Sequence, residues 1–186
     1  MTRAISDDLE WGKGHIERSS GIYIITARDW KLSEADYVAY ADACLTGLGF
    51  WIPKHHLGFY AEVPYSTPTE WIYFREMWAV LSALCYAVED QQLRGKKLLI
   101  YTDNTNTRDA FHTLSADPTH NHIMKKAADL LISSDNQLQV LHIDGELNVI
   151  ADALSRHQLE RAISFDPAIN CHHFLPPRDA LGETLQ

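Results

Sequence analysis

The stretch Leu98-Leu99-Ile100-Tyr101-Thr102-Asp103 decides the fold that this sequence predicts. The run that ends at Thr102 is almost continuously apolar, which is typical of a central strand covered on both faces of a sheet. Asp103 follows at the carboxyl end of this strand, where open α/β sheets place their ligands. The stretch therefore predicts an α/β fold with a candidate functional carboxylate at one edge of its sheet.

Four more strands are predicted around this one. Three precede it as short runs joined by turns, and Pro53 and Pro64 end the second and third of them. Because the connections are short, an antiparallel meander is the simplest arrangement. Gly47 and Gly49 inside the second run indicate a bulge or a close approach of another backbone. The predicted ranges are 37–43, 47–52, 57–63 and, after the central strand, 138–143.

Four helices are predicted between and after the strands. Ser66-Thr67-Pro68-Thr69-Glu70 is a helix-start pattern, and the helix that follows runs to about Val88 with a buried apolar stripe at helical spacing. The other helices are predicted at 105–114, 121–131 and 147–157. The order of elements is that of a mixed sheet flanked by helices.

Four acidic residues stand at comparable points of these elements. Asp42 lies in the first strand, Glu76 in the first long helix, Asp103 at the end of the central strand and Asp152 in the last helix. Three of the four have apolar neighbours in the chain, where an unpaired carboxylate is costly to desolvate. Converging carboxylates also repel one another unless a cation lies between them. Bound divalent metal ions resolve both problems, and phosphoryl transfer uses such a cluster.

Each acid also has a simpler explanation when it is taken alone. Asp103 fits a turn residue equally well, Glu76 fits a solvated helix face, and Asp42 fits an acceptor for turn amides. Asp152 can pair with Arg156 at i,i+4 on one helix. The joint pattern favours a shared site, because four separate explanations would have to produce the same order of residue types and elements.

The order of strand Asp, helix Glu, strand-end Asp and helix Asp resembles the ribonuclease H family. The stretch Gly145-Glu146-Leu147-Asn148-Val149-Ile150-Ala151-Asp152-Ala153-Leu154-Ser155-Arg156 more specifically resembles the ribonuclease H domain fused to reverse transcriptase in gypsy-type or tyrosine-recombinase-type retrotransposons. The resemblance covers about residues 35–157. Residues 9–22 are similar to the connection after the polymerase of such elements, and residues 174–178 to the linker after ribonuclease H.

On this resemblance we expect three parts. Residues 1–34 form a connection-like extension, in which Asp7-Asp8-Leu9-Glu10 opens a short helix and residues 21–25 form a strand. Residues 35–160 form an α/β domain of the ribonuclease H-like fold, with a five-stranded mixed sheet flanked by helices. Residues 161–186 form an irregular, linker-like tail.

The resemblance also implies an activity and a metal site. It implies a metal-dependent endonuclease that hydrolyses the RNA strand of an RNA/DNA hybrid with two Mg²⁺ ions, for which Mn²⁺ can substitute. The catalytic residues and metal ligands would be Asp42, which bridges both ions, Glu76 and Asp103 on the leaving-group side, and Asp152 at the ion that activates water. The polymerase domain of a reverse transcriptase, fused or separate, is the expected partner.

The resemblance positions five residues for substrate contacts. These are the backbone near Ala43 and Cys44 and the side chains of Asn104, Thr105 and Asn148. Asn104 and Asn148 serve equally well as helix caps, so both explanations stay open. The sequence lacks the second ligand pair that would make Cys171-His172-His173 a structural zinc site.

The charge balance does not match that of a typical nucleic-acid binder. The chain has 16 Lys and Arg against 25 Asp and Glu, a formal net charge of −9, whereas such proteins usually present a basic surface. We therefore expect weak binding by the chain alone. The three cysteines have no motif spacing, which favours reduced thiols in an intracellular protein of the cytoplasm or nucleus. No signal peptide or membrane-spanning run is visible, so no membrane association is expected.

Two other functions remain open. One is a catalytically silent ribonuclease H-like fragment that acts as a scaffold or as a module binding nucleic acid or polymerase. The other is a DDE-type integrase on the same fold, which the positions of Glu76 on the first long helix and Asp152 on the last disfavour, because an integrase carries its catalytic Glu on a late helix.

Overall fold

The computed structural model of the chain describes residues 3–18, 30–63, 72–114, 116–117 and 120–178. The chain divides into two compact units, residues 1–31 and 32–186. The first unit contains the 16-residue helix α1 (Arg3–Arg18), which starts earlier and is longer than the sequence predicted. Asp7 and Asp8 therefore lie beyond its first turn, which carries no acidic residue. The strand predicted at 21–25 lies outside the described residues.

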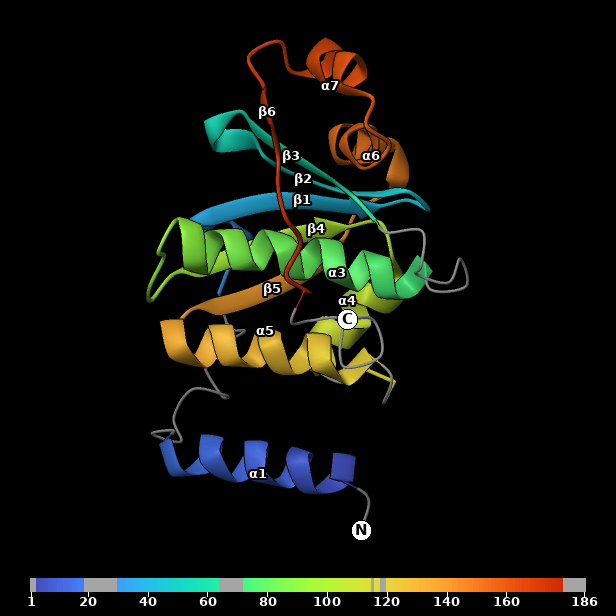
Figure 1. Cartoon of the computed structure of the whole chain (residues 1–186). Helices are drawn as coiled ribbons and strands as arrows, with labels where there is room; N and C mark the ends of the chain where they lie inside the picture. Colours follow the sequence, from blue (N-terminus) through green and yellow to red (C-terminus); the bar gives the residue numbers. More distant parts are fainter. Residues whose placement is uncertain (1–2, 19–29, 64–71, 115, 118–119, 179–186) are drawn as a thin grey trace. The chain divides into compact units, whose positions relative to one another are not determined.

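The second unit is built on a six-stranded mixed sheet with the strand order β5-β4-β1-β2-β3-β6 (Figure 1). Strands β1, β2 and β3 form the predicted antiparallel meander, whereas β4 runs parallel to β1, β5 to β4 and β6 to β3. The strands are β1 (Tyr37–Ala43), β2 (Gly47–Ile52), β3 (Leu57–Glu62), β4 (Lys97–Thr102), β5 (Gln137–His142) and β6 (Asn170–His173).

The register between β1 and β4 places two of the predicted acids next to each other. Tyr40 pairs with Tyr101 in these parallel strands. Asp42 and Asp103 each follow two residues later, so both reach the same carboxyl edge of the sheet. Neighbouring parallel strands thus bring together two acids that are far apart in the sequence.

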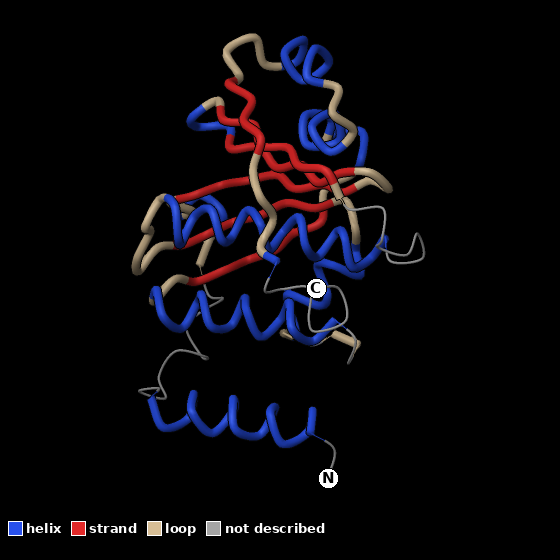
Figure 2. The backbone as a smooth tube through the Cα atoms, viewed as in Figure 1, coloured by secondary structure: helices blue, strands red, loops and turns tan. Residues whose placement is uncertain are grey.

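Helices cover both faces of the sheet, as Figure 2 shows. The long helix α3 packs in the main core on one face, where Phe50 and Trp78 are buried together with residues of α5. Helix α6 packs on the opposite face in a smaller core that includes Leu154 and Ile169. The helices of this unit are α3 (Ile72–Cys85), which continues into a π-helical turn (Tyr86–Asp90), α4 (Thr105–Thr113), α5 (Asn121–Ser134), α6 (Val149–Ser155) and α7 (Leu159–Phe165).

Gly49 in β2 lets α6 approach the sheet closely. A Cβ atom at this position would lie 2.5 Å from the backbone nitrogen of Ser155 and 2.8 Å from the carbonyl oxygen of Ala151. Only a residue without a side chain fits between the strand and the helix. The close backbone approach that the glycines predicted is therefore present, and it determines how near α6 lies to β1 and β2.

The expectation of an irregular tail is wrong for several described residues. Residues 159–165 form α7, and β6 adds a sixth strand to the five predicted. The backbone N–H of Asn170 donates to the carbonyl of His56 at 2.7 Å, and that of Phe174 donates to Tyr60 at 3.1 Å. The polar run Asn-Cys-His-His has no alternating pattern, so only its pairing with a distant strand makes it a strand. Whether residues 161–186 act as a linker stays a prediction.

Within the described part of the chain, no helix is long and apolar enough to cross a membrane.

Candidate metal centre

Three of the four predicted acids converge at the carboxyl edge of the sheet. One carboxylate oxygen each of Asp42, Glu76 and Asp103 lies within 4.8 Å of the others. Asp42 comes from the end of β1, Glu76 from the second turn of α3 and Asp103 from the residue after β4. Three elements that pack in one core therefore deliver three carboxylates to one point.

Two of these carboxylates are almost completely removed from water. Asp42 is 4% exposed and Glu76 is 6% exposed, whereas Asp103 is half-buried. The Oε2 atom of Glu76 is buried and has no hydrogen-bond partner among the described residues. A buried, unsatisfied carboxylate oxygen is costly unless a cation or a proton compensates it.

Burial and mutual repulsion change the protonation of this cluster. Burial raises the pKa of Asp42 to about 7, the charges of Asp103 and Asp152 add to this rise, and a hydrogen bond from Ser155 opposes it. Burial, followed by the charges of Asp42 and Asp103, raises the pKa of Glu76 to about 9. Burial also raises the pKa of Asp103. A divalent cation that prefers oxygen ligands would offset the repulsion between the carboxylates and would give the unpaired Oε2 of Glu76 a partner. These residues therefore fit such a metal ion.

Asp152 lies outside this group of three, among the described residues. Its Oδ1 accepts a hydrogen bond from Nε of Arg156 at 2.6 Å, and its Oδ2 accepts one from Nη1 of Arg161 at 2.7 Å. Burial alone would raise the pKa of Asp152, but the hydrogen bonds from the two arginines outweigh it and lower the pKa. The charge of Asp152 still raises the pKa of Asp42 and of Asp103, so Asp152 is close to the cluster. Its carboxylate does not join the group of three that could hold one ion.

The simple alternative for Asp152, a pair with Arg156 at i,i+4, is present in the structure. The contact with Arg161 was not anticipated. Arg161 stands on a separate helix, α7, and nothing in the sequence indicates that this helix folds back towards Asp152.

Ser155 is a second residue of the site that the sequence analysis missed. It is completely buried, and its Oγ lies 2.5 Å from Oδ2 of Asp42 and 2.9 Å from the carbonyl oxygen of Asp152. A serine among the apolar residues Ala151, Ala153 and Leu154 was the only available signal. Ser155 therefore links α6 to the most buried acid of the cluster.

Asn148 also ties α6 to β1. Its Nδ2 donates to the carbonyl oxygen of Ala41 at 3.1 Å, its side chain is buried, and its Oδ1 has no partner among the described residues. It makes no side-chain capping bond to α6. Its predicted contact with a substrate stays a prediction.

The other predicted substrate contacts occupy different environments. Asn104 caps α4, since its Oδ1 accepts from the backbone N–H of Thr107 at 2.9 Å, and Thr105 is exposed in the first turn of that helix. Cys44 is buried, and its Sγ donates to the carbonyl oxygen of Ser155 at 3.1 Å. The backbone N–H of Ala43 donates to Glu76, which partly offsets the rise in the Glu76 pKa.

The loop before α6 lies directly beside the cluster. A Cβ atom at Gly145 would be 3.1 Å from Oδ2 of Asp103, and the loop forms a short 3₁₀ turn over residues 145–147. Glu146 in this turn is exposed. Residues 145–155 thus reach the site with the loop as well as with α6.

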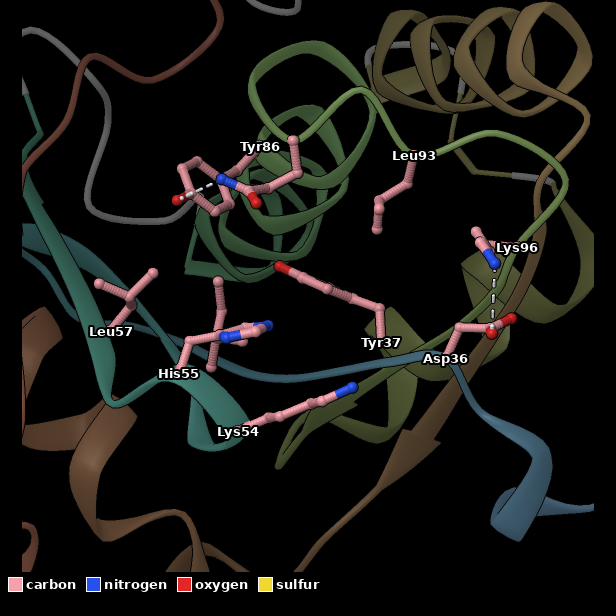
Figure 3. Close-up of a pocket in the computed structure, with 10 residues that line it drawn as sticks. Asp36, Tyr37, Lys54, His55, Leu57, Tyr86, Leu93 and Lys96 are labelled. Atoms are coloured by element: carbon pink, nitrogen blue, oxygen red, sulfur yellow. Dashed lines mark hydrogen bonds and ion pairs between the residues drawn. The ribbon is translucent and has the colours of Figure 1, made fainter.

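A separate pocket of about 250 Å³ lies at the amino ends of β1 and β4, the end of the sheet opposite to the acids (Figure 3). Tyr37, Leu57 and Tyr86 contribute to its lining, and a pair between Asp36 and Lys96, 3.6 Å apart, lies at one side. None of the four acids lines this pocket.

The sequence matches no protein-family model and no curated protein. Known structures do resemble the fold. Ribonuclease H1 of the halophilic archaeon Halobacterium salinarum superposes with a TM-score of 0.52 at 16% identity, over 67% of this chain and 97% of that one. LC11 ribonuclease H1, solved in complex with an RNA/DNA hybrid, gives a TM-score of 0.52 at 21% identity, over 68% of this chain and 98% of that one.

The foamy viral protease-reverse transcriptase, also solved with an RNA/DNA hybrid, gives a TM-score of 0.52 at 16% identity. The match covers 69% of this chain but only 20% of the viral chain. Identities this low show a shared fold and nothing finer. Together with the mixed sheet and its two layers of helices, they show that the chain has a ribonuclease H-like fold.

Proposed function

We propose that the chain is a metal-dependent endonuclease that hydrolyses the RNA strand of RNA/DNA hybrids. The observation that carries this proposal is the convergence of Asp42, Glu76 and Asp103 within 4.8 Å, with one Glu76 oxygen buried and unpaired. The fold adds support, because structures with the same fold have been solved in complex with RNA/DNA hybrids.

Asp42, Glu76 and Asp103 would hold the metal, with Asp152 as a fourth ligand once its arginines release it. Carboxylate oxygens are the ligands that Mg²⁺ prefers, and Mn²⁺ accepts the same set. A pair of such ions, when bound, supplies an activated water and charge stabilisation at the reacting phosphate.

The protein's own residues orient the ligands. Ser155 donates to Asp42 and fixes the direction of its carboxylate, and the Ala43 backbone N–H does the same for Glu76. Both acids are shielded from water, so water screens their charges only weakly. Once ionised, they attract a cation that lies between them more strongly than exposed carboxylates would. Asp103 is half-buried and gives the cluster its open side.

Polar groups beside the open side of the cluster support the proposed substrate class. The exposed first turn of α4, with Thr105 behind the cap residue Asn104, starts at the residues that follow Asp103. These polar groups can reach 2′-hydroxyls across the shallow minor groove of a hybrid, which distinguish RNA from DNA. We place the chain in a retroelement reverse transcriptase of the gypsy or tyrosine-recombinase type, with the polymerase domain as its intracellular partner, on the resemblance of residues 145–156.

The test is a cleavage assay on a hybrid labelled in its RNA strand, with duplex DNA and duplex RNA as controls. We expect cleavage of the hybrid alone, dependent on Mg²⁺ or Mn²⁺ and abolished by EDTA. Absence of cleavage with either metal, in folded protein, contradicts the proposal.

A catalytically silent scaffold is the second candidate. The pairing of Asp152 with two arginines and the net charge of −9 favour it, since both weaken a nuclease. The same assay separates the two candidates, because a scaffold binds a partner without hydrolysing the hybrid at any metal concentration.

A further inference from the structure

The carboxylate of Asp152 is enclosed by two guanidinium groups that come from different helical segments. Arg156 directly follows α6 and Arg161 lies in α7. Their side chains are 51% and 41% exposed, whereas the side chain of Asp152 is only 23% exposed. The two cations are thus more open to solvent than the acid that they hold.

Neither guanidinium uses all of its N–H donors to bind Asp152. In the described part of the chain, Arg156 uses its Nε and Arg161 its Nη1 for the hydrogen bonds to the carboxylate, while the same Nη1 of Arg161 reaches Oε1 of Gln158 at 3.0 Å. A guanidinium has five N–H donors in a planar fork. Each arginine therefore keeps donors with which it can bind an incoming phosphate before it releases Asp152.

The position of the pair makes a nucleic-acid phosphate the fitting anion. The Oγ atom of Ser155 lies 2.5 Å from Oδ2 of Asp42 and 2.9 Å from the carbonyl oxygen of Asp152, so the arginines that hold Asp152 lie beside the cluster rather than on a remote surface. Planar guanidinium groups bind phosphate oxygens in the same two-point manner as carboxylate oxygens. In a chain with 25 acids and 16 basic residues, these two arginines supply positive charge beside the acidic cluster, where a polyanion needs it.

We propose that Arg156 and Arg161 form a binding site for a backbone phosphate of the substrate, and that Asp152 occupies this site while no substrate is bound. The inference rests on the proposed function for the identity of the substrate. When the phosphate arrives, the arginines exchange Asp152 for it, and the released carboxylate turns to the metal centre. Substrate binding and metal binding are therefore coupled, and each strengthens the other.

Two binding measurements without turnover test this exchange. In the first, a fluorescent RNA/DNA hybrid is titrated in EDTA at several salt concentrations. In the second, Mg²⁺ is titrated into the nucleic-acid-free protein by calorimetry. The variants are Arg161→Gln and Arg156→Gln, and the control is Arg94→Gln, an exposed arginine whose Nη1 donates only to the carbonyls of Val88 and Leu93 among the described residues.

We expect opposite effects on the two ligands. Arg161→Gln should weaken hybrid binding about tenfold and reduce the slope of log affinity against log salt by about 1. The same variant should bind Mg²⁺ more tightly, because Asp152 is then held by Arg156 alone and is released to the metal centre more easily. A structural role would weaken both affinities, so the opposite signs distinguish the exchange from a loss of folding. Arg94→Gln should change neither affinity.

A conservative variant controls for the possibility that the glutamine variants misfold. Arg161→Lys keeps the charge but loses the planar fork, so it should keep the salt slope and still weaken hybrid binding. Unchanged hybrid affinity and slope in both glutamine variants, a joint loss of hybrid and Mg²⁺ affinity, or no measurable hybrid binding by the unmodified chain would each overturn the proposal. A chain that shows the opposite effects but cleaves no hybrid would refute the nuclease and leave the phosphate site intact.

Discussion

The hydroxyl of Ser155 lies 2.5 Å from Oδ2 of Asp42, across 113 positions of sequence. The contact is buried and joins α6 to a carboxylate of the three-acid cluster. Since hydrogen bonding to the charged form favours ionisation, Ser155 keeps Asp42 closer to the state that a cation binds.

Replacement of this serine should reduce activity and shift its pH dependence. Ser155→Ala removes a hydrogen bond to a charged group, worth about 1.5–3 kcal/mol, so we expect the rate to fall about tenfold or more. The pKa of Asp42 should rise, which moves the rising limb of the pH–rate profile to higher pH. Ser133→Ala, at an exposed position of α5, is the matched control. A reduced rate with an unshifted profile would mean that Ser155 only packs.

Stability without metal should decrease as the pH rises. Folding raises the pKa of Asp42 to about 7 and that of Glu76 to about 9, so the folded state binds more protons than the unfolded state between about pH 4 and pH 9. Stability is then fully present below the unfolded pKa values and is lost as the pH rises through the folded ones, by an amount on the order of a few kcal/mol.

Thermal melts in EDTA between pH 5 and pH 9 measure this effect. Glu76→Gln should flatten the decline, because the amide keeps the shape without a titrating charge. Saturating Mg²⁺ should flatten it as well, since the cation stabilises the ionised cluster. A melting temperature that rises with pH in EDTA would contradict this prediction. It would show that groups of the protein itself stabilise the ionised carboxylates.

The close approach at Gly49 should tolerate no side chain. Gly49→Ala places a methyl group 2.5 Å from the Ser155 backbone, so we expect a loss of about 1–3 kcal/mol in the free energy of unfolding. Displacement of α6 should also break the contact between Ser155 and Asp42 and lower activity. Gly12→Ala is the control, because a Cβ there meets nothing within 4 Å and alanine favours the helix. Equal stability of the two variants would contradict the predicted role of Gly49.

The isolated chain should bind hybrid weakly and with strong salt dependence. Its 16 basic residues face 25 acidic ones, and each phosphate contact needs a lysine or arginine. Fusion to a reverse-transcriptase polymerase domain should therefore raise hybrid affinity more than it raises the rate of the chemical step. Dissociation constants of both forms at two salt concentrations and fixed Mg²⁺ decide this. Nanomolar binding by the isolated chain at physiological salt would contradict the charge argument.

Local sequence patterns predicted the elements that fold through local rules. Strands β1 and β2 have the predicted bounds 37–43 and 47–52, because turn residues end them and their partners follow in the chain. Strand β6 was missed, since a four-residue polar segment gains its structure only from a parallel pairing with β3. A few local patterns were enough to predict the fold class. The sixth strand could be identified only from the tertiary structure.

The candidate site divides in the same way. The acids at 42, 76 and 103 were predictable because strand ends and an early helical turn fix where they point. Arg161 and Ser155 were not, because their contacts depend on how α7 and α6 fold back on the sheet. Asn104 caps α4, as local chemistry allowed, and its contact with a substrate stays a prediction.

The central claim is that the carboxylate cluster performs metal-dependent hydrolysis of RNA in a hybrid, and single-turnover cleavage by Asp103→Asn tests it most directly. The substitution keeps the shape of the side chain and removes one of three mutually repelling charges, so the protein should fold with equal or higher stability in EDTA. Asp109→Asn on α4 is the matched control, as an exposed acid bound to Arg108. We predict that Asp103→Asn lowers the cleavage rate about a thousandfold or more while Asp109→Asn retains it. Full activity in Asp103→Asn would contradict the account.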